Sequence, residues 1–290
     1  MHLALVANRK SGSGRVDLDE VEALLASGGA NDIRAIELAD LDTTELEGID
    51  RLVVAGGDGT IAGAAACAVR SRCDLAVVPA GTANDFARAL QIPLDPGAAA
   101  AMAADPGART RTAELARAGE VPYVNAAACG LTVTAAERAG RLKRALGPLA
   151  YGVGAVNAGL NAHTITARVV VDGEVLHHGA AWQVMIAASG AFGGGATLGP
   201  VDADDGRLDV AVIPTGSRVG LVGRAWGMRT GTLYEQSGIK YGRGREVLVE
   251  GPRDFNVDGE LLELDRALFR VDGTVPVVVG TTGGSTHAAR

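Results

Sequence analysis

Residues 52–60, with the sequence LVVAGGDGT, constrain the fold of this chain more than any other segment. Their apolar start, residues 52–54, suits a buried strand. The glycines that follow allow a tight turn and close approach to a ligand, and the small-residue helix expected at residues 61–69 would direct its N–H groups toward that ligand. This geometry favours phosphate. The three glycines are Gly56, Gly57 and Gly59.

Asp58 makes the proposed ligand more specific. A carboxylate beside phosphate oxygens is repulsive unless a divalent cation lies between them, as when magnesium is held by a carboxylate and substrate phosphates. The segment therefore suggests a metal–nucleotide site. An ordinary strand–turn–helix junction also uses Gly, Asp and Thr, so the segment by itself leaves both interpretations open.

Composition narrows the functional class. A chain of 290 residues that is 47% hydrophobic and 21% charged can bury one large core or two smaller ones. A net charge of −7 argues against a nucleic-acid binder. The cysteines (Cys67, Cys73 and Cys129) support neither a disulfide framework nor a zinc site. Without a signal-peptide pattern or a run of about 20 apolar residues, we expect a cytoplasmic protein, at most peripheral at the inner membrane surface.

Two further loops follow strands. The strand expected at residues 3–7 runs into a Gly/Ser-rich loop that lacks the GxxxxGK[ST] pattern but can wrap phosphates through Asn8, Ser11 and Gly12; a polar loop before a helix at residues 16–26 is the alternative. The apolar residues 75–78 run into PAGTANDFAR, which we expect at the same carboxyl edge of a parallel sheet as the first loop. Asn84 and Asp85 are alternatively N-cap residues.

The sequences GGDGT at residues 56–60 and PAGTANDFAR at residues 79–88 together closely resemble the catalytic domain of the diacylglycerol kinase family, which includes bacterial lipid kinases and sphingosine kinases. The first element is shared with phosphofructokinases and NAD kinases, whereas the second is typical of the lipid-kinase branch. Weaker matches extend the resemblance nearly to the C-terminus: YVN at 123–125, Gly130, GPLAY at 147–151, FGGG at 192–195, DGRLD at 205–209 and NVDGE at 256–260.

The resemblance implies an N-terminal α/β domain with a parallel sheet, a C-terminal domain that is mainly an antiparallel β-sandwich, and a nucleotide cleft between them. The sequence pattern independently indicates the same two domains, because expected strands and helices alternate up to Gly119 and short β-rich runs follow Ala162. Those runs are residues 165–171, 182–187, 208–213, 246–249, 261–264 and 275–279. We predict domains at residues 1–121 and 122–279, with a tail at 280–290 that frays or packs back on the first domain.

The resemblance also implies ATP-dependent, magnesium-dependent phosphoryl transfer. Asp58 and Asp85 would hold catalytic magnesium, and Glu114 matches the place where the family usually has an aspartate before leucine. ATP phosphates would contact the loop residues Asn8, Ser11, Gly12, Gly56, Gly57, Gly59, Thr60, Gly81, Thr82 and Asn84. A structural magnesium would bind Asp205 and the carbonyls of Asp202 and Arg207; a charged turn before a strand is the alternative.

The resemblance selects Glu260 as the base that accepts the proton of a lipid hydroxyl. From the residues alone, Asp258-Gly259 is first a two-residue hairpin turn. The segment Asp172-Gly173-Glu174 has the same pattern, so spacing does not choose between the two glutamates.

Several positions depart from the family pattern. Arg9 replaces a usual proline, Ala62-Gly63 replaces Asn-Glu, and Ser189 stands in place of asparagine before the glycine triplet. Together with Glu114, these departures keep two alternatives open: a kinase for a soluble acceptor, similar to NAD kinase, and a catalytically impaired nucleotide- or lipid-binding protein.

A lipid acceptor in phospholipid metabolism would require contact with a membrane surface. A basic run precedes the apolar residues 146–160, and a second basic cluster lies near residue 241; solvated charged faces are the alternative. The sequence is compatible with a homodimer and does not identify the lipid. The basic residues are Arg138, Arg141, Lys143 and Arg144 in the run, and Lys240, Arg243 and Arg245 in the cluster.

Overall fold

The structure is a computed structural model that describes residues 1–7, 18–28, 30, 32–81, 83–131, 133, 163–189, 198, 205–216, 221, 224, 227, 230 and 232–280. It divides into two compact units, one of Met1–Ala113 with Thr274–Arg290 and the other of Glu114–Gly273. The chain enters the second unit within β5 (Arg109–Ala118) and leaves it within β15 (Ala267–Val279). The domain limits expected from the sequence stay predictions.

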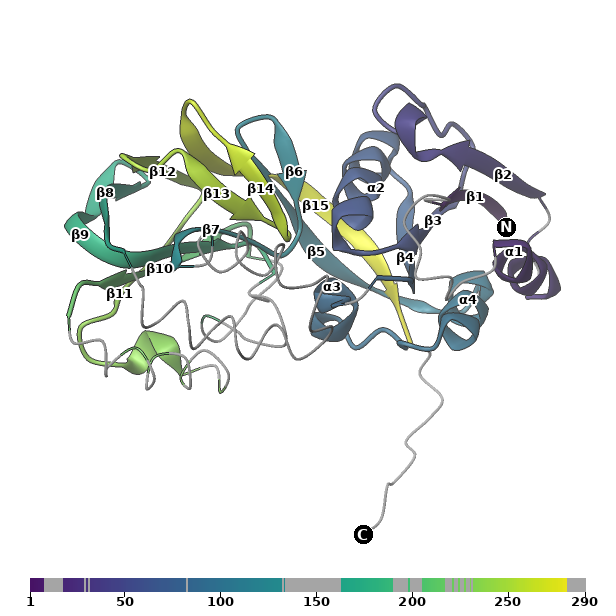
Figure 1. Ribbon diagram of the computed structural model, residues 1–290. Coiled ribbons are helices and arrows are strands. Elements are labelled where there is room, and N and C mark those ends of the chain that lie inside the picture. Colours follow the sequence, from purple (N-terminus) through teal and green to yellow (C-terminus); the bar gives the residue numbers. More distant parts are fainter. Residues whose placement is uncertain are drawn as a thin grey trace, which may run out of the picture. The chain divides into compact units, whose positions relative to one another are not determined.

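The first unit is built on a parallel sheet (Figure 1). Its strand order is β15-β4-β3-β1-β2, and each neighbouring pair is parallel. All six residues of β3 are buried, as expected for the apolar central strand of a sheet covered on both faces. The strands are β1 (His2–Ala7), β2 (Asp32–Glu37), β3 (Arg51–Gly56) and β4 (Asp74–Pro79).

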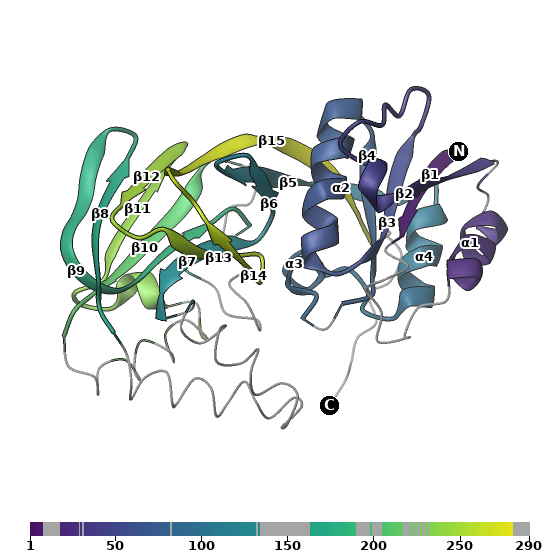
Figure 2. The ribbon, with the colours of Figure 1, turned by 45° about the horizontal axis from the view of Figure 1, so that its top comes forward.

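The helices of this unit cover the sheet (Figure 2). Helix α2 (Asp58–Ser71) packs on β3 and β4, and α4 (Pro96–Ala104) packs on β4 and on α1 (Leu18–Ser27). Asp95 caps α4 by accepting a hydrogen bond of 2.8 Å from the Ala98 amide. The short helices η1 (Leu38–Asp40) and α3 (Asp85–Ala89) complete the unit. None of the helices in the described part of the chain is long and apolar enough to cross a membrane.

The second unit is an antiparallel β structure centred on β9 (Glu174–Ala187). The first half of β9 pairs with β8, and its second half pairs with β7 and β10. The other strands are β6 (Val121–Tyr123), β7 (Ala126–Gly130), β8 (Ile165–Val171), β10 (Leu208–Pro214), β11 (Lys240–Gly244), β12 (Glu246–Glu250), β13 (Asp254–Val257) and β14 (Glu260–Glu263); η3 (Leu233–Glu235) is a short helix.

The side chains of β9 alternate between two apolar clusters, one on each face of the strand. Val184 and Ile186 belong to the larger cluster, and Met185 and Ala187 to the smaller one, because successive side chains of a strand point to opposite faces. Aromatic rings fill the larger cluster: the Tyr123 and Phe269 rings meet edge to face, with centroids 6.4 Å apart, and Phe255 tilts onto Phe269 at 5.2 Å. The predicted fold class, α/β followed by a mainly antiparallel β domain, is confirmed.

Both predicted Asp-Gly hairpin turns are present. Asp172 and Gly173 have φ angles of 47° and 88°, and Asp258 and Gly259 have φ angles of 46° and 92°. Two successive residues in the left-handed region define the turn type that suits the twist of a β-hairpin. Each turn is followed directly by a glutamate that opens a strand, Glu174 in β9 and Glu260 in β14.

Candidate active site

The GGDGT and PAGTANDFAR loops meet at one edge of the first sheet, as predicted. Strands β3 and β4 are parallel neighbours in which Gly56 lies opposite Pro79. The Ala80 amide then donates to the Gly56 carbonyl at 2.9 Å. The two loops therefore leave the sheet side by side.

Glycines allow the two loops to touch. A Cβ atom on Gly81 would lie 2.7 Å from the Cα atom of Gly57, and one on Gly57 would lie 3.2 Å from the Cα atom of Gly81. At Gly56, a Cβ atom would collide with the side chain of Thr60, which is buried. Contact between the loops thus requires Gly57 and Gly81, and the turn after β3 requires Gly56, in addition to any role in ligand approach.

The Asp58 carboxylate links the first loop to the helix that follows the second. Its Oδ2 accepts from the Asp85 amide at 3.3 Å, and its Oδ1 accepts from the Phe86 amide at 3.0 Å. First-turn amides have no partner inside their own helix, so Asp58 caps α3 from a distance in sequence. The capping fixes the orientation of the carboxylate, and it places Asp58 and Asp85 together.

Asn84 shapes its own loop. It has φ of 51°, its Oδ1 accepts from the Gly81 amide at 2.9 Å, and its Nδ2 donates to the Gly81 carbonyl at 3.2 Å. It occupies the N-cap position of α3 without a capping hydrogen bond from its side chain. The alternative that Asn84 caps the helix with its side chain is therefore wrong, because Asp58 supplies that acceptor.

This donor set fits a nucleotide-bound magnesium ion. The Asp58 carboxylate lies against the backbone of a second acid, Asp85. Carboxylate oxygens are ligands that Mg²⁺ prefers, and Mg²⁺ typically uses one or two carboxylates with substrate phosphates. Among the described residues, no group of three His, Cys, Asp or Glu side chains could hold a metal by itself. The remaining predicted phosphate contacts Asn8, Ser11, Gly12 and Thr82 lie outside the described residues.

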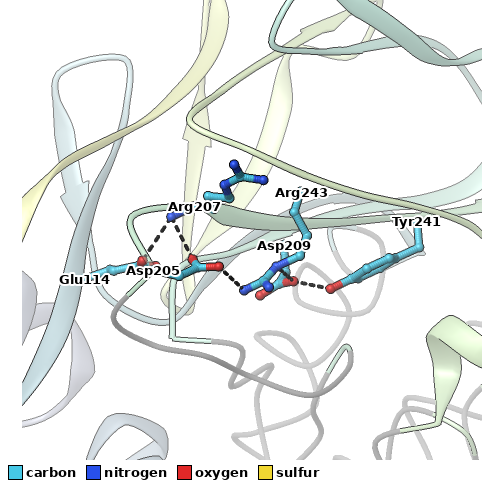
Figure 3. Close-up of polar contacts among 6 residues, drawn as sticks. All are labelled: Glu114, Asp205, Arg207, Asp209, Tyr241 and Arg243. Carbon is cyan, nitrogen blue, oxygen red and sulfur yellow. Dashed lines mark hydrogen bonds and ion pairs between the residues drawn. The ribbon is translucent and has the colours of Figure 1, made fainter.

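A second polar cluster surrounds Asp205, Asp209 and Arg243 in the second unit (Figure 3). The Arg243 guanidinium contacts Asp205 Oδ2 at 2.8 Å and Asp209 Oδ1 at 2.9 Å, and the Tyr241 hydroxyl donates to Asp209. Arg243, which we expected in a surface basic cluster, thus forms ion pairs with two acids. A cation bound by Asp205 would compete with this guanidinium. Asp202, whose backbone carbonyl was predicted as a ligand together with that of Arg207, lies outside the described residues.

Glu114 belongs to the same cluster. It is fully buried, its Oε1 accepts from the Arg207 amide at 3.0 Å, and its Oε2 has no hydrogen-bond partner among the described residues. Burial raises the pKa of Glu114 to about 7, because desolvation disfavours the charged carboxylate. Its role as a ligand of catalytic magnesium stays a prediction.

Burial also raises the pKa of Asp209. The residue is 2% exposed, and the hydrogen bond from Tyr241 and the charge of Arg243 offset part of the desolvation. Sequence reasoning missed this buried pair, although the DGRLD segment and the basic residues near 241 contain both partners. Their proximity depends on the register in which β10 pairs with β11, which places Asp209 opposite Arg243. The local sequence does not predict this register.

The two turn glutamates occupy similar local positions. Glu260 opens β14 and pairs with Val257, while Glu174 opens β9 and pairs with Val171. Both are exposed. Local backbone geometry therefore does not distinguish them, as the sequence also did not.

Comparison with known proteins identifies the family. The family model described as diacylglycerol kinase catalytic domain matches residues 2–118, and the model described as the YegS C-terminal NAD kinase beta sandwich-like domain matches residues 125–278. A probable YegS-like lipid kinase of Pseudomonas aeruginosa is 34% identical over 77% of this chain and 74% of its own. The chain belongs to the diacylglycerol kinase catalytic-domain family.

Other relatives agree with this placement. A diacylglycerol kinase of Mycobacterium tuberculosis is 28% identical over 81% of this chain and 76% of its own. The crystal structure of a diacylglycerol kinase from Bacillus anthracis covers 96% of this chain and 97% of its own, with a TM-score of 0.76 and 20% identity. That structure supports the same fold.

We predict that Gly81→Ala destabilises the protein, whereas Gly63→Ala does not. The new methyl group at position 81 would collide with the backbone of Gly57, but at position 63 its nearest neighbour is a Leu41 methyl group 3.8 Å away. Small-to-large changes in close packing cost about 1–3 kcal/mol, while Gly→Ala inside a helix gains up to about 1 kcal/mol. Urea unfolding measures both, and equal stability of the two variants would contradict the packing argument.

We predict that Arg243→Met lowers stability by roughly 3 kcal/mol near neutral pH, because it leaves the buried Asp209 carboxylate without its cation. The pKa of Asp209, already raised by burial, would rise further in this variant. The deficit should therefore shrink as the pH falls and Asp209 binds a proton. Unfolding curves across pH test this, and Asp209→Asn added to Arg243→Met should recover part of the loss; a deficit independent of pH would contradict it.

Proposed function

We propose that this protein is an ATP-dependent lipid kinase, which transfers the γ-phosphate of ATP to the hydroxyl of diacylglycerol or a similar lipid alcohol. The observation that carries the proposal is the joined pair of glycine loops with Asp58 oriented between them. Family membership and the YegS-like lipid kinases among the relatives support the same conclusion.

In this proposal the first unit binds the nucleotide. Backbone amides of the glycine loops and the N-terminus of α2 would contact the phosphates, and Asp58 and Asp85 would hold magnesium. When bound, magnesium neutralises charge on the phosphate oxygens during transfer. The two amides that orient Asp58 keep its carboxylate positioned before ATP arrives.

Glu260 acts in this proposal as the general base. Its carboxylate accepts the proton of the lipid hydroxyl while that oxygen bonds to the γ-phosphorus, and the bond from this phosphorus to the oxygen that bridges the β- and γ-phosphates breaks. ADP and the phosphorylated lipid are the products. Glu260 is exposed at the start of β14, so it is accessible to an incoming substrate.

A lipid must be collected from a membrane, so we propose peripheral contact with the inner membrane surface. The basic and apolar run of residues 138–160 lies outside the described residues. In the second basic cluster, Lys240 and Arg245 are exposed and would face anionic headgroups, while Arg243 stays bound to its acids.

One observation favours a second candidate. The model that matches residues 125–278 is described as the YegS C-terminal NAD kinase beta sandwich-like domain, and this likeness to NAD kinase makes a kinase for a soluble acceptor the second candidate. Labelling of a water-soluble alcohol without lipid would support it. ATP binding without turnover on any acceptor would instead support an impaired enzyme, as the departures at Ala62, Gly63 and Ser189 suggest.

We predict that the purified protein with ATP and magnesium phosphorylates a lipid in a broad lipid panel, and that Glu260→Gln lowers kcat by about 10²–10⁴-fold, the usual contribution of a general base. Glu174→Gln is the matched control, because Glu174 follows an equivalent Asp-Gly turn. Transfer of labelled phosphate with mass spectrometry of the product provides the measurement.

A wild-type protein that labels nothing in the panel contradicts the lipid-kinase assignment. A Glu260→Gln variant as fast as wild type contradicts only the choice of base, and loss of activity in Glu174→Gln alone would reverse that choice.

We predict that Asp58→Asn raises the magnesium concentration required for half-maximal activity and lowers kcat more than tenfold, on the scale of lost charge stabilisation in a transition state. Asp95→Asn is the control, since Asp95 also caps a helix through its carboxylate but lies outside the glycine loops. Magnesium titrations of both variants measure the effect. If both variants respond alike, Asp58 has a structural role only.

A further inference from the structure

We infer that Asp258 is a positioning residue for Glu260, the base in the proposed function on which this inference rests. Its carboxylate accepts three backbone hydrogen bonds from residues 124–126, which lead from β6 into β7: from the Val124 amide to Oδ2 at 2.8 Å, and from the Asn125 and Ala126 amides to Oδ1 at 3.0 Å each. Its own amide donates to the Ala126 carbonyl at 3.0 Å.

These four bonds fix the turn that carries Glu260. Gly259 follows Asp258 with φ of 92°, and Glu260 comes next, paired with Val257 across the hairpin. Val257 is in turn paired with Ala127 of β7. Asp258 therefore joins the tip of the β13–β14 hairpin to a neighbouring segment, two residues from the glutamate.

The neighbouring segment is itself anchored. Asn125 is buried, its carbonyl accepts from the Ala188 amide at 2.9 Å, and its side-chain Oδ1 accepts from the Ser189 hydroxyl at 3.5 Å. Asp258 thus ties the turn of a short hairpin to a segment that is held by Ala188 and Ser189, the two residues after β9. A general base works only within hydrogen-bond reach of the proton that it removes, so this anchoring limits where Glu260 can lie.

The chain contains its own control for this role. Asp172 sits in the equivalent turn, accepts from the Arg245 and Glu246 amides at 2.9 Å each, and donates from its amide to the Glu246 carbonyl at 2.9 Å. The two aspartates therefore anchor their turns in the same way, Asp172 before Glu174 and Asp258 before Glu260. Only the second should matter for phosphoryl transfer.

Asp258→Asn and Asp172→Asn form the first matched pair. Asparagine tolerates the left-handed backbone of both turns, but its Nδ2 group cannot accept a hydrogen bond. We expect Asp258→Asn to lower kcat roughly ten- to a hundredfold, the scale expected for a misplaced catalytic group, with KM for ATP unchanged. We expect Asp172→Asn to keep the wild-type kcat.

Gly259→Ala and Gly173→Ala form the second pair, which decides the question if Asp258→Asn does not fold. Both glycines have positive φ, of 92° and 88°, and a Cβ atom on either would meet nothing within 4 Å. Each substitution therefore strains only the turn. We expect Gly259→Ala to lower kcat and Gly173→Ala to leave it unchanged.

The assay is steady-state transfer of labelled phosphate from ATP to the lipid acceptor, with urea unfolding of each variant. Loss of kcat in both position-258 and position-259 variants, with controls of similar stability that stay active, supports the inference. Wild-type kcat in a folded Asp258→Asn or Gly259→Ala protein overturns it, as does equal loss in the Asp172 and Gly173 controls. If Glu260→Gln is as active as wild type, the proposed base fails first, which is a separate result.

Discussion

The Asp58 carboxylate is the interaction on which the candidate nucleotide site depends. It accepts the first amides of α3 while belonging to the first turn of α2, so one side chain connects the two glycine loops. The Gly57–Gly81 contact lets the loops come close enough for this bond. A carboxylate that already accepts two backbone hydrogen bonds is held in place before a ligand binds, and such preorganisation reduces the reorganisation required during phosphoryl transfer.

Aspartates that accept backbone amides of another segment also occur in the second unit. Asp258 and Asp172 each accept amides of an adjacent segment, and each begins a turn that its left-handed backbone makes tight. Hydrogen bonds to a charged acceptor are stronger than those between neutral groups. These hydrogen bonds hold small polar turns in place without packing from large side chains. Only 3% of the residues of this protein are aromatic. Three of the aromatic rings, those of Tyr123, Phe255 and Phe269, pack together in the core of the second unit.

Local patterns predicted the elements that carry strong signals. The apolar runs before the two glycine loops became β3 and β4, and residues 165–171 became β8, because alternating or continuous apolar residues report burial directly. Strands β5, β7 and β11 were missed, since their sequences RTRTAELARA, AAACG and KYGRG have little β-branched content. Those strands form because partners from distant segments pair with them. Likewise, nothing local indicates that Asp58 rather than Asn84 caps α3; that depends on the register of β3 against β4.

The two Asp-Gly-Glu segments show where local inference ends. Their turns, backbone angles and carboxylate contacts agree closely, so neither sequence nor local geometry assigns a catalytic role to one of them. The difference lies in what each turn is attached to. Asp172 holds the start of β12. Asp258 instead holds residues 124–126, a segment in which Asn125 also contacts the two residues that follow β9. A catalytic role must therefore come from the environment of a motif, and the kind of backbone hydrogen bonding that stabilises one hairpin can position a base in another.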